Sequence, residues 1–337
     1  MYNQEKKSMK IGKLPETVLE RSVIRQIGHR RKEVLSGPGI GIDCSALRTD
    51  PEEILVFSTD PITGTGSHFG AFAIHVTAND LAAAGADPVA VMLTALLPES
   101  IGEPEIRAIV QDAEAVCEEL NMEIIGGHTE VTDAVGQPLL SVTGIGKIPA
   151  GMELLSPASI EPGDALIVTK WIGLEATAIL AEDHAPELLT RLPEELIRTA
   201  SGFLQYLSVV PEAHVARTNG ARAMHDVTEG GIFGALWEMA EAGGCGLQVD
   251  VKAIPIRQET VEICEFFDVD PYQIMSSGSM LIAAKDGLKV MHALQDAGIP
   301  AALIGSMTEG NDRILRNGEE IRYLDRPKPD ELYRVKR

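Results

Sequence analysis

Apolar residues along the chain recur at two spacings, one typical of helices and one typical of strands. Apolar positions three and four residues apart predict helices over residues 70–84, 103–120, 174–181, 194–215, 232–242 and 287–297. Short apolar runs bounded by Gly, Pro or Asp predict strands over 54–58, 122–127, 138–148, 164–170, 246–251, 279–284 and 301–305, and a hairpin over 312–324. Strands and helices alternate in both halves of the chain, which predicts an α/β or α+β fold.

A Pro- and Gly-rich stretch without periodicity, residues 149–164, separates the two halves. The chain has 337 residues, a length at which two domains are expected. We therefore predict an N-terminal domain over residues 1–152 and a C-terminal domain over residues 153–337.

Composition and charge narrow the class of protein. No apolar run approaches the ~20 residues of a membrane span, and the first residues contain no apolar core of a secretion signal. The four cysteines, Cys44, Cys117, Cys245 and Cys264, have no metal-type spacing and are expected to be reduced thiols. These features predict a cytoplasmic protein. The net charge of −21 suits solubility and argues against nucleic acid or a membrane as partner.

Polar clusters flanked by glycine occur at 39–47, 58–64, 77–85, 126–132 and 225–231, and four of them carry one aspartate each: Asp43, Asp60, Asp80 and Asp226. Glycine allows the backbone to approach a ligand closely and exposes N–H groups to phosphate oxygens. Aspartate oxygens suit Mg²⁺, which commonly binds substrate phosphates as well. The clusters predict a metal–nucleotide site. It is not a P-loop, because no G-x-x-x-x-G-K-[ST] motif is present.

Each candidate also has a structural alternative. Asp60 precedes Pro61 and could lie in a turn, and Asp226 could cap a helix that opens near Gly230. His128 could be a structural histidine, and Asn79 could bond the histidine four residues before it.

The clusters "GIDCSAL", "STDPI", "ANDLAAAGADP", "GGHTEV", "EPGDALIVTKWIG" and "HDVTEGG", in this order, are more specific than any one of them. The chain resembles the superfamily of AIR synthetase, selenophosphate synthetase, thiamine-monophosphate kinase and the hydrogenase maturation carbamoyl dehydratase, over nearly its whole length. The resemblance implies an N-terminal α/β domain whose sheet pairs with its twin into a barrel across a homodimer. A second, α+β domain would follow.

The resemblance also implies ATP and Mg²⁺ as cofactors and assigns roles to residues. The metal would be held by Asp43, Asp60, Asp80 and Asp226, and the nucleotide would contact Thr59, Asn79, Gly126, Gly127 and Thr129. His128, His225 and Lys13 are the candidates for catalysis. Lys13 and Lys170 could neutralise phosphate charge, or each could be a solvated surface lysine.

The implied function is a Mg²⁺–ATP-dependent enzyme that phosphorylates or activates an oxygen of a small substrate. Within the superfamily the pattern is most similar to the carbamoyl dehydratase group, whose members carry a reactive cysteine in a C-terminal tail. The last cysteine of this sequence is Cys264, and Cys44 is either a nucleophile or an inert thiol. The alternative function is a non-catalytic nucleotide-binding homodimer that regulates or scaffolds a maturation complex with a protein partner.

Overall fold

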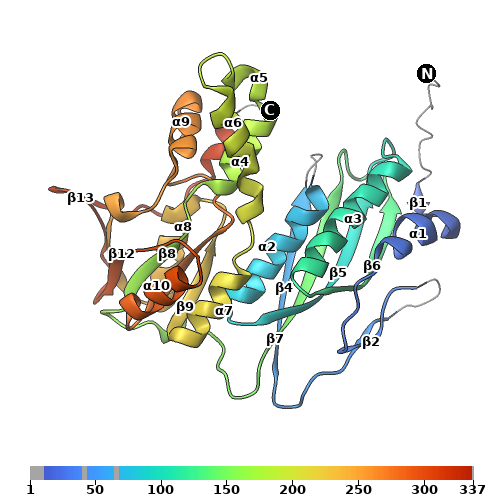
Figure 1. Cartoon of the computed structure of the whole chain (residues 1–337), viewed down its shortest axis with the longest axis horizontal. Helices are drawn as coiled ribbons and strands as arrows, with labels where there is room; N and C mark the ends of the chain where they lie inside the picture. The colour runs from blue at the N-terminus through green and yellow to red at the C-terminus, as the bar shows by residue number, and fades with distance from the viewer. Residues whose placement is uncertain (1–10, 40–43, 64–67, 336–337) are drawn as a thin grey trace. The chain divides into compact units, whose positions relative to one another are not determined.

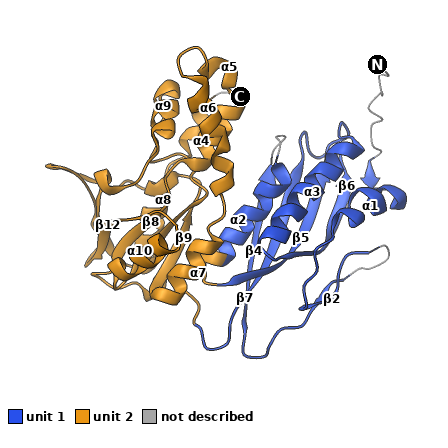
Figure 2. Ribbon diagram, viewed as in Figure 1, with its two compact units in different colours: residues 1–81, 86–152 blue, residues 82–85, 153–337 orange. Residues whose placement is uncertain are grey.

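The computed structural model describes residues 11–39, 44–63 and 68–335. The chain divides into two compact units, drawn in different colours in Figure 2. Unit 1 comprises residues 1–81 and 86–152, and unit 2 comprises residues 82–85 and 153–337. Each unit is described by itself below.

Unit 1 is built on a five-stranded sheet with the order β1 (Gly12–Lys13), β6 (Glu123–Val131), β5 (Asp87–Leu97), β7 (Leu139–Ile148) and β4 (Ile54–Thr63). Strand β5 runs parallel to β6, and the other neighbours are antiparallel. Helices α2 (Phe69–Ala83) and α3 (Glu103–Glu119) lie along one face of this sheet (Figure 1). The shorter elements of the unit are α1 (Glu16–Ser22), η1 (Ile24–Gln26), β2 (Val34–Ser36) and β3 (Ala46–Leu47).

Small residues let α2 lie close to the sheet. A Cβ on Gly144 of β7 would lie 2.5 Å from Cγ2 of Thr77, and one on Gly146 would lie 3.4 Å from Cβ of Leu81. Both helix residues are fully buried. Helix α3 buries the apolar stripe that its 3.6-residue period predicts, including Ile106 and Ala113.

Unit 2 is built on a seven-stranded sheet, ordered β14 (Glu320–Tyr323), β13 (Arg313–Asn317), β10 (Gly246–Asp250), β12 (Ala301–Thr308), β8 (Ala165–Thr169), β11 (Ser279–Ala284) and β9 (Ala221–Val227). Helix α8 (Gly231–Gly243) packs on one face through the core of Leu281 and Ala283. Residues of α7 (Val210–Asn219) and α10 (Gly287–Asp296) pack with Ile167, Met280 and Ile282, which point to the other face. The remaining elements are η2 (Pro157–Ser159), α4 (Leu174–Asp183), α5 (Ala185–Leu188), α6 (Glu194–Ser201), η3 (Gly202–Tyr206), η4 (Val251–Ala253), α9 (Gln258–Phe267) and η5 (Glu331–Arg334).

The structure departs from the expected elements in several places. Strands β5 and β9 and helix α9 have no counterpart among them, although β5 is the central strand of unit 1. The single helix expected over 194–215 is wrong: it divides into α6, η3 and α7, with Gly202 at the first break and Pro211 in the first turn of α7. The expected closure of the first sheet is not seen in one chain: among the described residues, β1 and β4 remain its open edges.

Asp60 and Pro61 do not form a turn, so that alternative is wrong. Both lie within β4, opposite Val142 and Ser141 of β7. Proline is tolerated there because β4 is an edge strand and needs no N–H donor on its outer side. Among the described helices, none has both the length and the apolar character that crossing a membrane requires.

Candidate nucleotide and metal site

One face of the unit 1 sheet, opposite α2 and α3, carries polar side chains in rows across the strands. We call it the open face. In the first row Thr59, Thr143, Met92 and Gly126 are successive partners across β4, β7, β5 and β6. The hydroxyls of Thr59 and Thr143 are 3.1 Å apart, which confirms that they share the face.

The next rows of the open face carry two of the residues expected to act in catalysis. His128 lies opposite Thr94, and its Nε2 is 2.9 Å from Oε2 of Glu130. Glu130 in turn lies opposite Lys13 on the edge strand β1. The structure therefore brings Thr59, Gly126, His128 and Lys13 to one face of one sheet.

The two glycines of β6 are required by the backbone. Gly127 has φ +144°, and a Cβ there would lie 1.8 Å from the carbonyl oxygen of Leu93. The register between β5 and β6 shifts just before Gly126, and the carbonyl of Ile125 accepts a hydrogen bond from the hydroxyl of Ser45. A Cβ on Gly126 would lie 2.8 Å from that hydroxyl oxygen. Because glycine has no side chain, β6 can pass close to Ser45 at this point.

A cavity of about 490 Å³ opens at these glycines. Its polar lining includes Lys13, His128 and Thr129, together with Gly126 and Gly127. The rest of the wall is mostly apolar and comes from α1, η1, α3 and the sheet. Five of the expected site residues thus line one cavity, which has the size and mixed lining of a small-molecule site.

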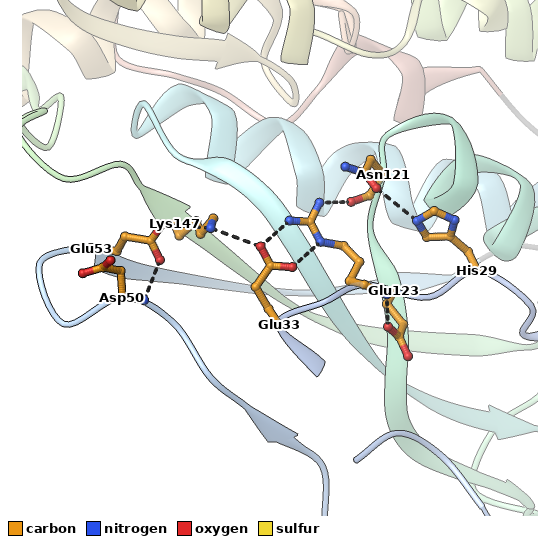
Figure 3. A network of polar contacts seen from close by, with 8 residues as sticks. His29, Glu33, Asp50, Glu53, Asn121, Glu123 and Lys147 are labelled. Atoms are coloured by element: carbon orange, nitrogen blue, oxygen red, sulfur yellow. Dashed lines mark hydrogen bonds and ion pairs between the residues drawn. The ribbon is translucent and has the colours of Figure 1, made fainter. Parts of the chain in front are cut away.

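A polar network holds the segment that forms one wall of this cavity (Figure 3). Glu33 is buried and accepts hydrogen bonds from the guanidinium of Arg31, at 2.9 and 3.1 Å, and from Nζ of Lys147, at 3.1 Å. Lys147 also donates to Glu53 at 2.8 Å. Burial works against the charged form of Glu33, but the hydrogen bonds from Arg31 and Lys147 outweigh it and lower its pKa to about 2.

The same network reaches β6 through a second buried carboxylate. Glu123 accepts a hydrogen bond from the backbone N–H of Arg31 at 2.6 Å. A Cβ on Gly37 would lie 3.3 Å from Oε1 of Glu123, and Gly37 lines the cavity. The network therefore fixes the position of residues 31–37 against the sheet.

Asp60 and Asp80 meet through one hydroxyl on the other face of the sheet. Ser58 donates to Oδ2 of Asp80 at 2.5 Å and lies 3.4 Å from Oδ2 of Asp60. Asp80 belongs to α2, which covers this face, and Asn79 beside it is fully buried. Asp43 lies outside the described residues. Within the part of the chain that is described, no three His, Cys, Asp or Glu side chains are arranged to hold a metal.

The fourth aspartate, Asp226, lies in unit 2 near the end of β9 and is buried. Beside it, His225 contacts the carbonyl of Asp226 through Nδ1, at 2.8 Å, and Oε2 of Glu238 through Nε2, at 3.0 Å. Burial lowers the pKa of His225, but the hydrogen bond to Glu238 and the charge of Asp226 give a net upward shift. These contacts hold the imidazole in one orientation.

The alternative that Asp226 caps α8 is wrong. The N-cap residue of α8 is Gly230, and its N–H donates to Oδ2 of Asp330 at 2.7 Å. The hydrogen of Gly230 therefore points to a carboxylate of this chain. The sequence predicts that N–H groups in glycine turns bind phosphate, but the N–H of Gly230 already donates to Asp330.

Lys170 has a structural role that neither interpretation of the sequence foresaw. Its ammonium group is buried and lies 2.6 Å from Oε1 of Glu212. It also donates to the carbonyls of Tyr206, at 2.7 Å, and Ser208, at 2.6 Å. All three hydrogens are used, so Lys170 is neither a phosphate ligand nor a solvated surface lysine.

The cysteines separate into one exposed and three buried thiols. Cys44 is exposed beside Ser45, and Cys117, Cys245 and Cys264 are buried. Burial raises the pKa of Cys264 to about 12, and it raises that of Cys117 as well. A thiol that stays protonated is a poor nucleophile.

The sequence interpretation missed the residues that orient the candidates. Ser58, Glu130 and Glu238 each contact an expected site residue. Ser58 and Glu130 had a usable signal, because each stands two residues from a candidate, Asp60 in "STDP" and His128 in "HTE". Glu238 lies 13 residues beyond His225, and only the packing of α8 on β9 brings the two together.

The chain folds into two successive α/β units, and the first carries a pair of aspartates and a glycine-lined cavity. Family models assign both halves of the chain to one class of protein. Residues 41–148 match the N-terminal domain of the AIR synthase related proteins, and residues 161–316 match their C-terminal domain. A hydrogenase expression/formation protein of Methanocaldococcus jannaschii is 30% identical over 310 residues, which cover 88% of this chain and 90% of that protein. The chain belongs to the AIR synthase related family.

Within that family it is similar to hydrogenase maturation proteins. The carbamoyl dehydratase HypE of Rhizobium leguminosarum is 31% identical over 82% of this chain and 79% of that protein. A crystal structure of the hydrogenase maturation protein HypE in complex with ATP has the same fold, with a TM-score of 0.78 at 19% identity. It covers 94% of this chain and 95% of the other.

Proposed function

We propose that the protein is a Mg²⁺–ATP-dependent enzyme that phosphorylates, or otherwise activates, an oxygen of a small substrate. The observation that carries this proposal is the pair Asp60 and Asp80, joined by the hydroxyl of Ser58 in a chain of this family. Two carboxylates so close to one another favour a cation between them. ATP binding is supported by the relative HypE, whose structure contains ATP, and by a ThiL structure complexed with AMPPCP and TMP.

The residues present suit Mg²⁺. This ion is usually bound by one or two carboxylates and completes its shell with water and phosphate oxygens. Asp60 and Asp80 would supply the carboxylates in unit 1, with Asp43 and Asp226 as the further ligands. When bound, the ion would neutralise charge on the phosphates.

The other expected residues have proposed roles in the same reaction. Thr59, Gly126, Gly127 and Thr129 contact the nucleotide, and Asn79 supports Asp80 from within α2. Lys13 offers a positive charge in the lining of the cavity, and it lies opposite Glu130 in the sheet. His128 lies beside it and is oriented by Glu130, so it can exchange a proton with a bound substrate. His225, held by Glu238, has the corresponding role in unit 2.

The protein is proposed to act as a homodimer through the open face. Phe57 is 62% exposed there and Met92 38%, which is unusual for large apolar side chains on a sheet. Residues 1–152 would form the ATP-binding domain and residues 153–337 the second domain of each subunit. A partner in a maturation complex is supported by the HypE–HypF structure, which shares the fold.

The alternative, a nucleotide-binding scaffold without turnover, differs from the enzyme in one measurable respect. We expect ADP release from Mg²⁺–ATP that is stimulated by a small amide, carbonyl or phosphate compound. Oxygen-18 placed in that compound should appear in the phosphate released. Label that enters phosphate from water alone, with every compound tried, would favour the scaffold.

The metal role is tested by Asp80→Asn. Removing one carboxylate should weaken Mg²⁺-dependent ATP binding roughly tenfold or more, the effect of losing a charged ligand contact, with little change in melting temperature. The matched control is Asp133→Asn, an exposed aspartate of the same unit. Equal ATP affinity of Asp80→Asn and wild type in calorimetry contradicts the proposed site.

A further inference from the structure

The loop that follows Asp226 is confined by its backbone. Gly230 and Gly231 both adopt left-handed conformations, with φ +79° and +61°. A Cβ on Gly231 would lie 2.6 Å from the carbonyl oxygen of Tyr272 and 2.8 Å from that of Ile274. The loop is thus pressed against residues 272–274, and its N–H groups need acceptors in a crowded place.

Asp330, a hundred residues further along the chain, supplies that acceptor. Its Oδ2 accepts the N–H of Gly230 at 2.7 Å, and its Oδ1 accepts the N–H of Leu332 at 2.9 Å. Asp330 is 1% exposed. One buried carboxyl therefore ties the loop after β9 to the turn that contains Leu332.

The turn that carries Asp330 also contacts the loop at a second point. In η5, burial and the negative charge of the neighbouring Glu229 raise the pKa of the Tyr333 hydroxyl. The turn itself is anchored, because Leu332 packs in a core with Ile263 and the N–H of Glu331 donates to the carbonyl of Gln273 at 3.2 Å. One anchored turn thus binds Gly230 and lies beside its neighbour Glu229.

The loops held in this way lead directly to Asp226. The N–H of Ser277 donates to the buried carboxyl of Glu175 at 3.3 Å, and two residues later β11 begins at Ser279. Ser279 pairs with Val227, and the next residue, Met280, pairs with Asp226. Asp226 therefore lies between two segments whose backbone N–H groups donate to buried carboxyls. These are Gly230, which donates to Asp330, and Ser277, which donates to Glu175.

We propose that Asp330, assisted by Tyr333, is a positioning residue for Asp226. By holding Gly230, it fixes the end of β9 and with it the position of the Asp226 carboxylate that would bind Mg²⁺. Pre-organisation of this kind strengthens binding because less freedom is lost when the ligand arrives. The inference rests on the proposed function, since it assigns Asp226 to the metal.

The test uses Asp330→Asn, Tyr333→Phe and the control Asp325→Asn, which alters an exposed aspartate of the same C-terminal segment. ATP affinity is measured by calorimetry with and without Mg²⁺, and amide exchange of residues 225–234 by mass spectrometry. Asn retains one acceptor oxygen where Asp has two, so we expect about tenfold weaker binding with Mg²⁺ and faster exchange of the loop. Tyr333→Phe should act in the same direction but only about two- to threefold, because it removes one exposed polar group beside Glu229.

A positioning role predicts that, without Mg²⁺, ATP affinity is the same in all four proteins. A merely structural role would weaken binding equally with and without the metal, and that result overturns the inference. Tyr333 is 59% exposed, so Tyr333→Phe decides the question if Asp330→Asn does not fold. Wild type without Mg²⁺-dependent ATP binding would overturn the proposed function and this inference together. Binding that is present and equal in wild type and variants overturns the inference alone.

Discussion

The two sheets of the molecule use their faces differently. In unit 2 every residue of β11 is buried, with Leu281 in the core on one face and Met280 and Ile282 in the core on the other. In unit 1 the strand β4 alternates between intermediate and exposed residues along most of its length. Helices cover one face of that sheet, and the open face keeps Thr59, Thr143 and His128 accessible.

The difference shows which sheet can bind something else. Side chains that are buried on both faces of a sheet pack closely against their neighbours, so a substitution there lowers the free energy of unfolding. A face with polar rows and exposed Phe57 contributes little to the stability of one chain and is open to a ligand or a second copy. Four candidate residues of unit 1, Thr59, Gly126, His128 and Lys13, lie on this surface, whereas Asp60 and Asp80 lie on the face that α2 covers.

The largest expected effect tests this comparison directly. Leu281→Ala should lower the free energy of unfolding by about 2–5 kcal/mol, because it leaves a cavity in a closed core. Phe57→Ala removes a larger side chain but should cost the single chain less than about 1 kcal/mol, since the site is exposed. Denaturant unfolding at low protein concentration measures both.

Light scattering at micromolar concentration completes this prediction. Phe57→Ala should instead weaken self-association, while Leu281→Ala that still folds should not. Equal losses of unfolding free energy in the two variants would remove the distinction between the sheets. Wild type that is a monodisperse monomer would contradict the proposed homodimer.

Buried carboxyls sharpen the comparison. Glu33 in unit 1 has cationic partners, and its pKa is about 2, so its stabilising contribution is lost only as the pH falls from about 4.5 towards 2. Glu175 in unit 2 is fully buried beside Ser277 without a cation among its interactions. Burial raises its pKa to about 7, against the opposing hydrogen bonds of Ser277.

The second prediction follows from Glu175. Between its unfolded pKa, 4.5, and about 7, unfolding releases a proton, so the free energy of unfolding falls as the pH rises through this window. The loss is on the order of 3 kcal/mol. Glu175→Gln should lack this loss, and thermal melts from pH 5 to pH 8 should show the wild type declining relative to it. Parallel curves for Glu175→Gln, the wild type and the exposed control Glu182→Gln would contradict the assignment.

The smallest expected effect concerns Lys13 on the open face. Lys13→Ala should reduce ADP release about tenfold, the typical order for one charge that acts on a transition state. ATP affinity and melting temperature should be retained, because the side chain is exposed and fills no core. Steady-state kinetics and calorimetry on the same preparation measure the two quantities. An unchanged rate of ADP release in Lys13→Ala would show that Lys13 is a solvated surface lysine without a role in the reaction.

Much of the fold could be predicted from the sequence where the apolar pattern is clear. Helices α2 and α3 and strands β8, β10 and β11 form where their periodicity or apolar runs indicate. Strand β5 was missed because "DPVAVMLTALL" is apolar almost throughout and has proline as its second residue, just after a helix stop. A central strand flanked on both sides by others need not alternate, so periodicity alone cannot separate it from buried helix.

The sequence predicted which residues form the candidate site, but it did not predict which of them lie next to one another. Glycine at 126 and 127 is explained by a register shift and a close approach of Leu93 and Ser45, which the pattern "GGH" could suggest. The partners Glu238 and Asp330 could not be found, because Glu238 becomes a neighbour only through helix packing and Asp330 only through a long return of the chain.

The sequence by itself determined many of the elements, the glycine-flanked aspartates and the family. Only the tertiary structure decided which of those residues share a surface. Thr59 and Asp60 are adjacent in the chain, yet one lies on the open face beside Thr143 and the other contacts Ser58 towards α2. The reason is physical: successive side chains of a strand point to opposite faces, and register then selects their neighbours from strands far away in sequence.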